Sequence, residues 1–333
     1  MKAFRMDGPE IAAVVEIPNV VAQAGEALLR VKMVGMCGTD LNTFRGRNAM
    51  VSFPRVPGHE VAAEVIEGGG SLAAGTMVTI SPYTNCGRCP SCRRGRVNAC
   101  QFNETMGVQR DGAMTEYISV PVEKLYAAKL SIKELCLVEP LTVGFHAAAR
   151  GRVTAEDTVA VFGCGGVGLG AIASAAFRGA ETIAIDMDDD KLEIARKAGA
   201  KHLIHSKNED LHKRLRAITG GQGPDVMIEA IGLPETFRAA VEEVAFTGRV
   251  VYIGYAKEPV AYETRLFVQK ELDVLGSRNA LPEDFREVIR LLEAGRFPVE
   301  DAVSAVVPIE EAARMLGEWS DAPGKFTKIM VEI

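Results

Sequence analysis

Hydrophobic and polar positions follow two different patterns along the chain, and the change comes near residue 150. Before that point, short apolar runs are separated by glycine, proline and polar residues, a pattern typical of short strands and loops. The runs predicted as strands are VVEIP (14–18), ALLRVKMVGM (27–36), EVAAEVIEGG (60–69) and MVTISPYT (77–84). We therefore expect a β-rich part over roughly the first 145 residues.

Beyond residue 150, strand-like apolar runs alternate with helical segments. The six predicted strands cover 158–163, 182–188, 201–206, 225–232, 248–255 and 272–279. Strands that are apolar throughout and joined by helices are typical of an open parallel sheet that is covered on both faces. The sequence then predicts a helix from about residue 282 that closes at Gly295, and a final strand within 325–333.

Length and composition agree with a folded chain of two domains. There are 333 residues, of which 47% are hydrophobic and 25% charged, and domains average roughly 100–200 residues. The net charge of −6 argues against a nucleic-acid-binding protein, which usually carries a basic surface. The uncharged stretch 158–177 contains five glycines, so a strand, a turn and a helix explain it better than a membrane span. We expect a cytoplasmic protein without membrane or nucleic-acid partners.

A glycine-rich motif lies between the first predicted strand of the second part and the helix after it. GCGGVG, residues 163–168, matches the spacing G-x-G-x-x-G, and Asp186 ends the following strand. This context predicts a dinucleotide site, with the pyrophosphate at the helix N-terminus and Asp186 on the adenosine ribose, which favours NAD over NADP. The alternative is a glycine turn in an ordinary α/β unit. The expected cofactor-binding residues are Gly163, Gly165, Gly166, Val167, Gly168, Asp186, Lys191, Ile231, Gly254 and Asn279.

Four cysteines, Cys86, Cys89, Cys92 and Cys100, fall within fifteen residues with the spacing C-x2-C-x2-C-x7-C. Four thiolates in one loop suit a closed, tetrahedral structural zinc site, and the arginines of this loop would offset part of its negative charge. An iron–sulfur cluster, reduced spectator thiols and a zinc ribbon that binds nucleic acid are the alternatives.

A third set of residues combines sulfur, nitrogen and oxygen donors. Cys37 lies in GMCGTD, His59 and Glu60 lie in PGHE, and Glu139 lies in VEP. Such a donor set can leave one coordination position for water or substrate, as catalytic zinc sites do. The alternative is that each residue has an ordinary core or surface role. Asp40 is expected to orient a ligand such as His59.

These motifs occur in an order and at distances that resemble the zinc-dependent medium-chain dehydrogenase/reductase superfamily, over essentially the whole chain. The resemblance implies a GroES-like catalytic domain formed by residues 1–145 and 285–333, and a doubly wound Rossmann domain over 146–284. Within the superfamily the chain is most similar to the polyol and sugar-acid branch, which includes sorbitol, threonine and L-galactonate dehydrogenases.

The resemblance also implies roles for individual residues. Cys37, His59 and Glu60 would hold the catalytic zinc, and Glu139 would bind zinc or its water. Thr39 would accept the proton of a secondary alcohol whose hydride passes to NAD. The family often has histidine where this chain has Asn42, which cannot titrate, so the proton route beyond Thr39 differs.

The substrate expected from the resemblance is a sugar acid of the L-galactonate or L-gluconate type, and a neutral polyol or L-threonine is the alternative. Arg110 or Arg278 could bind the acid's carboxylate, with Arg45 and Arg47 near the metal segment; equally, Arg278 could order the carboxylates of the zinc site or the nicotinamide. The final strand of the parallel sheet would be its outer edge and pair chains into a homodimer or homotetramer. A zinc-free reductase of the superfamily would lack the Cys37/His59 pair, whereas a non-catalytic zinc and nucleotide sensor is compatible with the sequence.

Overall fold

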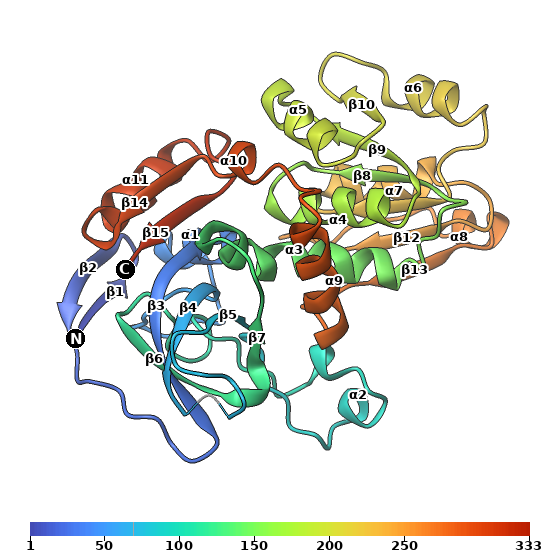
Figure 1. Ribbon diagram of the computed structural model, residues 1–333. Helices are drawn as coiled ribbons and strands as arrows, with labels where there is room; N and C mark the ends of the chain where they lie inside the picture. The colour runs from blue at the N-terminus through green and yellow to red at the C-terminus, as the bar shows by residue number, and fades with distance from the viewer. Residues whose placement is uncertain (69) are drawn as a thin grey trace. The chain divides into compact units, whose positions relative to one another are not determined.

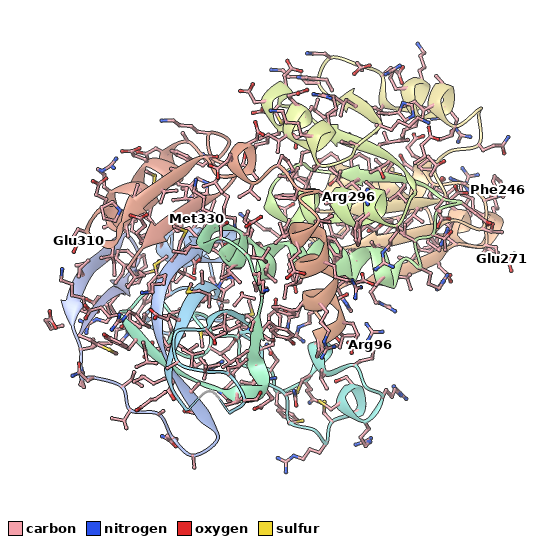
Figure 2. All side chains as sticks on the ribbon, in the orientation of Figure 1. Arg96, Phe246, Glu271, Arg296, Glu310 and Met330 are labelled. Atoms are coloured by element: carbon pink, nitrogen blue, oxygen red, sulfur yellow. The ribbon has the colours of Figure 1, made fainter. Side chains whose placement is uncertain are left out.

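One of the two units of the molecule is built from both ends of the chain. The computed structural model describes residues 1–68 and 70–333. Unit 1 comprises Met1–Glu139, Leu281–Glu293 and Val299–Ile333, and unit 2 comprises Pro140–Ala280 and Ala294–Pro298. Figure 1 shows the blue N-terminal strands beside the red C-terminal ones. Within unit 2, the Arg296 guanidinium lies 5.0 Å from the ring centroid of Phe177 (Figure 2).

Unit 1 contains a β-hairpin and a larger sheet. Strands β1 (Lys2–Gly8) and β2 (Ile11–Glu16) pair antiparallel. The seven-stranded sheet has the order β14-β15-β3-β4-β5-β7, and β6 also pairs with β3. Its strands are β3 (Glu26–Met36), β4 (Glu60–Glu67), β5 (Met77–Ile80), β6 (Tyr117–Pro121), β7 (Leu125–Ala127), β14 (Ala305–Pro308) and β15 (Ile329–Glu332). Gly69, the last residue of the run predicted as a strand over 60–69, lies outside the described residues.

The pairing of β15 with β3 brings the end of the chain next to the first metal-ligand candidate. The two strands are antiparallel, with Ile329 opposite Met36 and Val331 opposite Val34. Inward-facing residues of both strands, among them Leu29 and Val331, are buried in one apolar core. As a result, the residue that precedes β15, Lys328, lies beside the segment that follows β3, which begins with Cys37.

Short helices complete unit 1. They are α1 (Gly38–Phe44), α2 (Pro90–Arg93), α9 (Pro282–Glu293), α10 (Val299–Ala302) and α11 (Ala312–Asp321), with three 3-10 helices at Val97–Ala99, Val122–Lys124 and Ile309–Glu311. The helix predicted from residue 282 is therefore confirmed as α9, which ends two residues before Gly295.

The long helix α3 (Ile132–Arg150) was not expected in a part interpreted as strands and loops, and that interpretation was wrong here. Two features hide the helix. Its central residues are buried on all sides, so the run lacks the polar face that identifies a surface helix. Pro140 also lies inside it, and proline usually interrupts a helix because it lacks the N–H that would bond to the residue four positions earlier. Glu139 therefore lies on a helix.

Unit 2 is an open parallel sheet, as predicted. Its strand order is β10-β9-β8-β11-β12-β13, which in chain order reads 3-2-1-4-5-6, the order of dinucleotide-binding doubly wound sheets. The strands are β8 (Thr158–Phe162), β9 (Glu181–Asp186), β10 (His202–His205), β11 (Val226–Glu229), β12 (Arg249–Tyr252) and β13 (Asp273–Gly276). The helices are α4 (Gly166–Phe177), α5 (Asp189–Lys197), α6 (Leu211–Ile218), α7 (Pro234–Glu243) and α8 (Arg265–Gln269).

The uncharged stretch 158–177 forms β8, a turn and α4, as the glycines predicted. Across the described residues, none of the helices is both long and apolar enough to span a bilayer.

Candidate active site and metal centres

Unit 1 brings together three of the four residues predicted for an open metal site. Cys37 is the residue before α1, and His59 and Glu60 lie where the chain enters β4. Their ligand atoms all lie within 4.8 Å of one another. His59 and Glu60 are buried, whereas Cys37 is half-buried. The turn segments that look unrelated in sequence meet because β3 and β4 are adjacent antiparallel strands, with Gly35 opposite Glu60.

The electrostatics of this set favour a bound cation. His59 Nδ1 is buried and has no hydrogen-bond partner among the described residues. Burial opposes protonation of His59, but the hydrogen bond and charge of Cys37, helped by Asp40 and Glu139, raise its pKa well above the usual value. A thiolate, an imidazole and a carboxylate are donors that suit Zn²⁺. The residues present therefore fit a zinc site.

Besides its place in the candidate zinc site, Glu60 has a charged partner that the sequence did not reveal. The Lys328 ammonium lies 2.6 and 2.7 Å from the two Glu60 carboxylate oxygens, and it is 3.3 Å from the Met36 carbonyl oxygen. The charge of Glu60 offsets burial and raises the pKa of Lys328. Since 268 positions separate the two residues, local sequence offers no signal for this pair. Figure 2 labels Met330 on β15, the strand that begins directly after Lys328.

Glu139 is held by a tyrosine that sequence reasoning also missed. The Tyr83 hydroxyl donates a hydrogen bond to Glu139 Oε1 in the interior of unit 1. Burial raises the pKa of Glu139, as does the nearby charge of Glu60, although His59 works in the other direction. Burial and the charge of Glu139 raise the pKa of Tyr83 well above its ordinary value. Glu139 thus lies close to His59 and Glu60 without belonging to the set of atoms within 4.8 Å.

Asp40, which was predicted to orient a ligand such as His59, is hydrogen-bonded to Cys37 and not to His59. Its Oδ2 accepts a hydrogen bond of 2.9 Å from the Cys37 N–H and so caps α1. Its Oδ1 and His59 Nδ1 are both unpaired in the part of the chain that the structure describes. Thr39 is better placed for its expected role, because its Oγ1 lies 3.7 Å from Cys37 Sγ.

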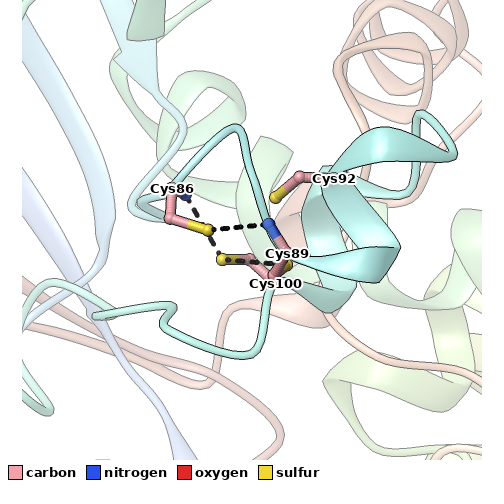
Figure 3. A group of neighbouring side chains, drawn as sticks. All are labelled: Cys86, Cys89, Cys92 and Cys100. Carbon is pink, nitrogen blue, oxygen red and sulfur yellow. Dashed lines mark hydrogen bonds between the residues drawn. The ribbon is translucent and has the colours of Figure 1, made fainter.

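The four clustered cysteines form a second metal-binding geometry (Figure 3). All four are free thiols, and their sulfur atoms lie within 4.8 Å of one another. Backbone N–H groups of Cys86, Cys89 and Phe102 donate to sulfur atoms of the cluster at 3.3 Å. This arrangement could hold a tetrahedral zinc ion with no open position.

The thiols of this loop also favour a cation at their centre. The hydrogen bond between Cys89 and the Ser91 hydroxyl, together with bonds from backbone N–H groups, lowers the pKa of Cys89 to about 5. Burial and the neighbouring thiols raise the pKa of Cys92 to about 11. The pKa values of these neighbouring thiols are thus shifted in opposite directions. A zinc ion would remove this difference, since it stabilises all four thiolates together.

In unit 2, the glycine motif forms the turn between β8 and α4. Gly163 has a φ of +92°, a conformation that favours glycine. A Cβ at Gly168 would lie 1.9 Å from the Gly163 carbonyl oxygen, so the helix packs against the turn only with glycine there. Gly165, which precedes α4, has open space where a side chain would project. Close packing at one glycine and free space at another match the fingerprint of a pyrophosphate-binding turn.

Asp186 is bonded directly to this turn. One carboxylate oxygen accepts from the Cys164 N–H and the other from the Met187 N–H, both at 2.7 Å. Each oxygen keeps a lone pair for another donor. The other expected cofactor residues lie in the same unit: Val167 in α4, Lys191 in the first turn of α5, Ile231 and Gly254 after β11 and β12, and Asn279 after β13.

The arginines considered for substrate binding have different surroundings. Arg45 is engaged by Ser320, to which its guanidinium donates hydrogen bonds, and Arg47 is exposed. Arg110, in unit 1, donates to the carbonyl oxygens of Glu104 and Pro82 at 3.5 and 3.3 Å, and burial lowers its pKa. Arg278, in unit 2, is exposed two residues after β13. Arg45 is therefore a poor candidate for a carboxylate ligand.

Comparison with known proteins gives the same assignment for both units. Residues 23–130 match the alcohol dehydrogenase GroES-like domain, and residues 166–294 match the zinc-binding dehydrogenase family. The chain is 35% identical to L-galactonate-5-dehydrogenase of Escherichia coli K12 over 86% of this chain and 84% of that protein. It is 34% identical to sorbitol dehydrogenase of Bacillus subtilis 168, over 83% and 81% of the two chains.

Among solved structures, an alcohol dehydrogenase of Escherichia coli CFT073 in complex with NADH superposes with a TM-score of 0.92. It is 26% identical, and the match covers 100% of this chain and 99% of the other. With two domain matches and relatives above 30% identity that cover more than two thirds of both chains, the chain belongs to the zinc-type alcohol dehydrogenase family, among its polyol and sugar dehydrogenases. It is a zinc-type dehydrogenase with a GroES-like domain and a Rossmann domain, as the resemblance implied.

Proposed function

We propose that this enzyme oxidises a secondary alcohol of a sugar acid, of the L-galactonate or L-gluconate type, with NAD as the hydride acceptor. The observation that carries the proposal is the Cys37–His59–Glu60 donor set, in which His59 and Glu60 are buried and Cys37 is half-buried. Its one sulfur, one nitrogen and one oxygen donor leave room in a tetrahedral ion's coordination for a substrate oxygen. The relatives named for galactonate and sorbitol support a polyhydroxylated substrate.

The residues around the donor set have distinct tasks in this proposal. A bound zinc ion would supply Lewis acidity toward the substrate hydroxyl. Thr39, 3.7 Å from Cys37 Sγ, relays the hydroxyl proton, because its own hydroxyl gives up a proton as it accepts one. Glu139 is kept in place by the Tyr83 hydroxyl. It is the fourth candidate, a carboxylate that would bind the zinc ion or its water. Lys328 fixes Glu60 from the side of the protein interior.

The glycine turn and Asp186 support NAD as the cofactor. The free space at Gly165 suits a pyrophosphate at the N-terminus of α4. The Asp186 carboxylate accepts hydrogen bonds from two backbone N–H groups. Its remaining lone pairs are available to accept hydrogen bonds from the ribose hydroxyls. Its negative charge would repel a 2′-phosphate, so NADP would bind less well.

Arg110 and Arg278 are the candidates for the substrate carboxylate. Among the described residues, the Arg110 side chain donates to the uncharged carbonyl groups of Glu104 and Pro82. A carboxylate would therefore give its partly buried charge a better partner. Arg278 lies just after the carboxyl end of β13. Ligands of doubly wound sheets bind at the carboxyl ends of the strands. A neutral polyol such as sorbitol remains the alternative substrate.

We also propose that the enzyme is a homodimer or homotetramer. Strand β13 is an outer strand of its sheet and is hydrogen-bonded only to β12 there. Val274 on this strand is 43% exposed and Val268 on α8 is 83% exposed. An apolar sheet edge is readily extended by pairing with a second chain.

The deciding experiment follows NADH absorbance with a panel of sugar acids, neutral polyols and L-threonine. We expect the highest kcat/KM with a sugar acid, and Cys37→Ser should abolish turnover while the chain stays folded. A preference for a neutral polyol would overturn the sugar-acid assignment. No NADH formation with any secondary alcohol by a zinc-loaded enzyme would overturn the proposed function and favour a non-catalytic role.

A further inference from the structure

The side chain of Glu229, the last residue of β11, is fully buried in unit 2. Its Oε1 accepts three hydrogen bonds, from the N–H of Ile231 at 2.9 Å, from the N–H of Gly232 at 2.8 Å and from the Thr236 hydroxyl at 2.7 Å. One carboxylate oxygen thus fixes the loop that follows β11 and the start of α7. Hydrogen bonds to an ionised acceptor are roughly twice as strong as neutral ones.

The same residue also holds the loop that follows the neighbouring strand. The Glu229 carbonyl oxygen accepts from the N–H groups of Ile253 at 2.9 Å and Gly254 at 3.2 Å. Its Oε2 lies over Gly254, where a Cβ would come within 2.4 Å of this oxygen. A Cβ at Gly232 would lie 2.8 Å from the Tyr255 carbonyl oxygen. The two loops are therefore packed backbone against backbone around one glutamate.

Both loops lie at the carboxyl ends of β11 and β12, in the second half of the sheet. A doubly wound sheet binds one nucleotide of the dinucleotide with each half, in the crevice outside the carboxyl ends of the strands. Asp186 ends β9 in the first half and marks the adenosine side. The loops held by Glu229 therefore belong to the nicotinamide side, and Ile231 in the first of them is 44% exposed.

Glu229 carries a feature that packing alone does not require. Its Oε2 is buried without a hydrogen-bond partner among the described residues, and an unpaired buried polar atom costs free energy. A glutamine could fill the same volume, but its single carbonyl oxygen is a weaker acceptor for three donors. The glutamate thus leaves one oxygen unpaired, but its other oxygen accepts stronger hydrogen bonds from Ile231 and Gly232 than a glutamine oxygen would.

We propose that Glu229 is a positioning residue for the nicotinamide half of the cofactor, because it fixes the two loops on that side of the dinucleotide site. This inference rests on the proposed use of a nicotinamide cofactor. It assigns to Glu229 no contact with the cofactor itself. Among the described residues, the Glu229 side chain makes no hydrogen bond to the glycine turn or to Asp186, although Ile231 of the first loop packs against Gly163. We therefore expect the larger effect on the nicotinamide half and a smaller one on the adenosine half.

The test is the affinity of Glu229→Gln for two ligands, NADH and ADP, measured by titration calorimetry on the zinc-loaded enzyme. ADP carries the adenosine and the pyrophosphate but no nicotinamide. We expect the Kd for NADH to rise about tenfold, as the loss of charge from several hydrogen bonds allows, and the Kd for ADP to rise much less. Asp186→Ala should instead weaken the binding of both NADH and ADP.

Glu243→Gln is the matched control. Glu243 is another buried glutamate of unit 2, bonded to His212 at 3.0 Å, and it ends α7 far along the helix from Thr236. This variant should bind NADH and ADP like the unmodified enzyme. Thr236→Val, which removes one of the three donors, should weaken NADH binding in the same direction by roughly threefold. It serves as the test if Glu229→Gln does not fold.

Three outcomes separate the possibilities. Unchanged NADH affinity in Glu229→Gln, or in Thr236→Val if the former does not fold, would overturn the positioning role. An equal loss for NADH and ADP would also overturn it, since it would mean a general structural role. If the unmodified enzyme bound ADP as tightly as NADH, the nicotinamide half would contribute nothing to binding. The proposed function itself would then fail.

Discussion

The Lys328 ammonium and the Glu60 carboxylate form a buried ion pair in which the nitrogen lies 2.6 and 2.7 Å from the two oxygens. The side chains are 7% and 1% exposed. A Cβ at Gly35 would lie 1.9 Å from Glu60 Oε2, so glycine on the facing strand makes room for the carboxylate. One candidate zinc ligand therefore already has a cationic partner on its inner side.

Removing Lys328 should destabilise the enzyme most when zinc is absent. In Lys328→Met, the buried Glu60 charge loses its partner, which costs about 3–5 kcal/mol for a typical buried pair. Zinc at Cys37, His59 and Glu60 would supply positive charge instead. We expect thermal unfolding by calorimetry to show a large loss in the chelator-treated protein and a smaller one after zinc is restored.

The matched control is Lys32→Met. Lys32 of β3 pairs with Glu64 at 2.8 Å on the same strand, β4, that carries Glu60, but both side chains are partly exposed. Its loss should cost less than about 1 kcal/mol, with or without zinc. An equal effect of Lys328→Met in the two metal states would refute the link between this lysine and the zinc site.

Metal analysis should give two zinc ions for each chain. A zinc ion held by Cys37, His59 and Glu60 would keep an open position, whereas one held by the four cysteines would be surrounded completely. A strong chelator should therefore remove the first ion sooner and abolish NADH formation while circular dichroism stays unchanged. The matched variants are Cys37→Ser and Cys92→Ser, which should each leave one zinc. A single zinc in the unmodified chain would contradict the expected metal content.

Asp186 should determine the choice of cofactor. The unmodified enzyme should have a higher kcat/KM with NAD than with NADP, because the carboxylate repels a 2′-phosphate. Asp186→Ala removes this repulsion together with the bonds to Cys164 and Met187, so activity with NAD should fall and the ratio should approach one. Asp188→Ala is the control, since that carboxylate caps α5 by accepting from the Lys191 N–H. Equal efficiency with both cofactors in the unmodified enzyme would exclude an NAD-selective role for Asp186.

The strands of unit 2 and the metal-binding motifs could be predicted because their signals are local. Apolar runs, a glycine spacing and a cysteine spacing each lie within a few tens of residues. Tyr83 and Lys328 could not be found this way, because a tyrosine in a loop or a lysine before a strand is ordinary until the fold brings it to Glu139 or Glu60. Helix α3 was missed for a different reason: burial on all sides and Pro140 remove the usual helical pattern.

Assembly can be tested at the edge strand. A charge at position 274, introduced by Val274→Lys, should oppose pairing of β13 between two chains, since charged residues protect natural sheet edges. Sedimentation equilibrium at micromolar concentration should show a dimer or tetramer for the unmodified enzyme and a smaller species for the variant. Val306→Lys, at a 37% exposed position on β14 of unit 1, is the control and should not change the mass. A monomeric unmodified enzyme would contradict the proposed assembly.

The substrate carboxylate can be located by comparing two arginine variants on matched substrates. Losing a charged hydrogen bond costs about 1.5–3 kcal/mol, so Arg110→Ala or Arg278→Ala should lower kcat/KM for a sugar acid roughly 10- to 100-fold. The corresponding neutral polyol should be much less affected by the same variant. Arg47→Ala, which removes an exposed guanidinium near the metal segment, serves as the comparison for a general loss of positive charge. If Arg110→Ala and Arg278→Ala each reduced activity equally for the acid and the polyol, neither arginine would bind the carboxylate, and a neutral polyol would become the better substrate assignment.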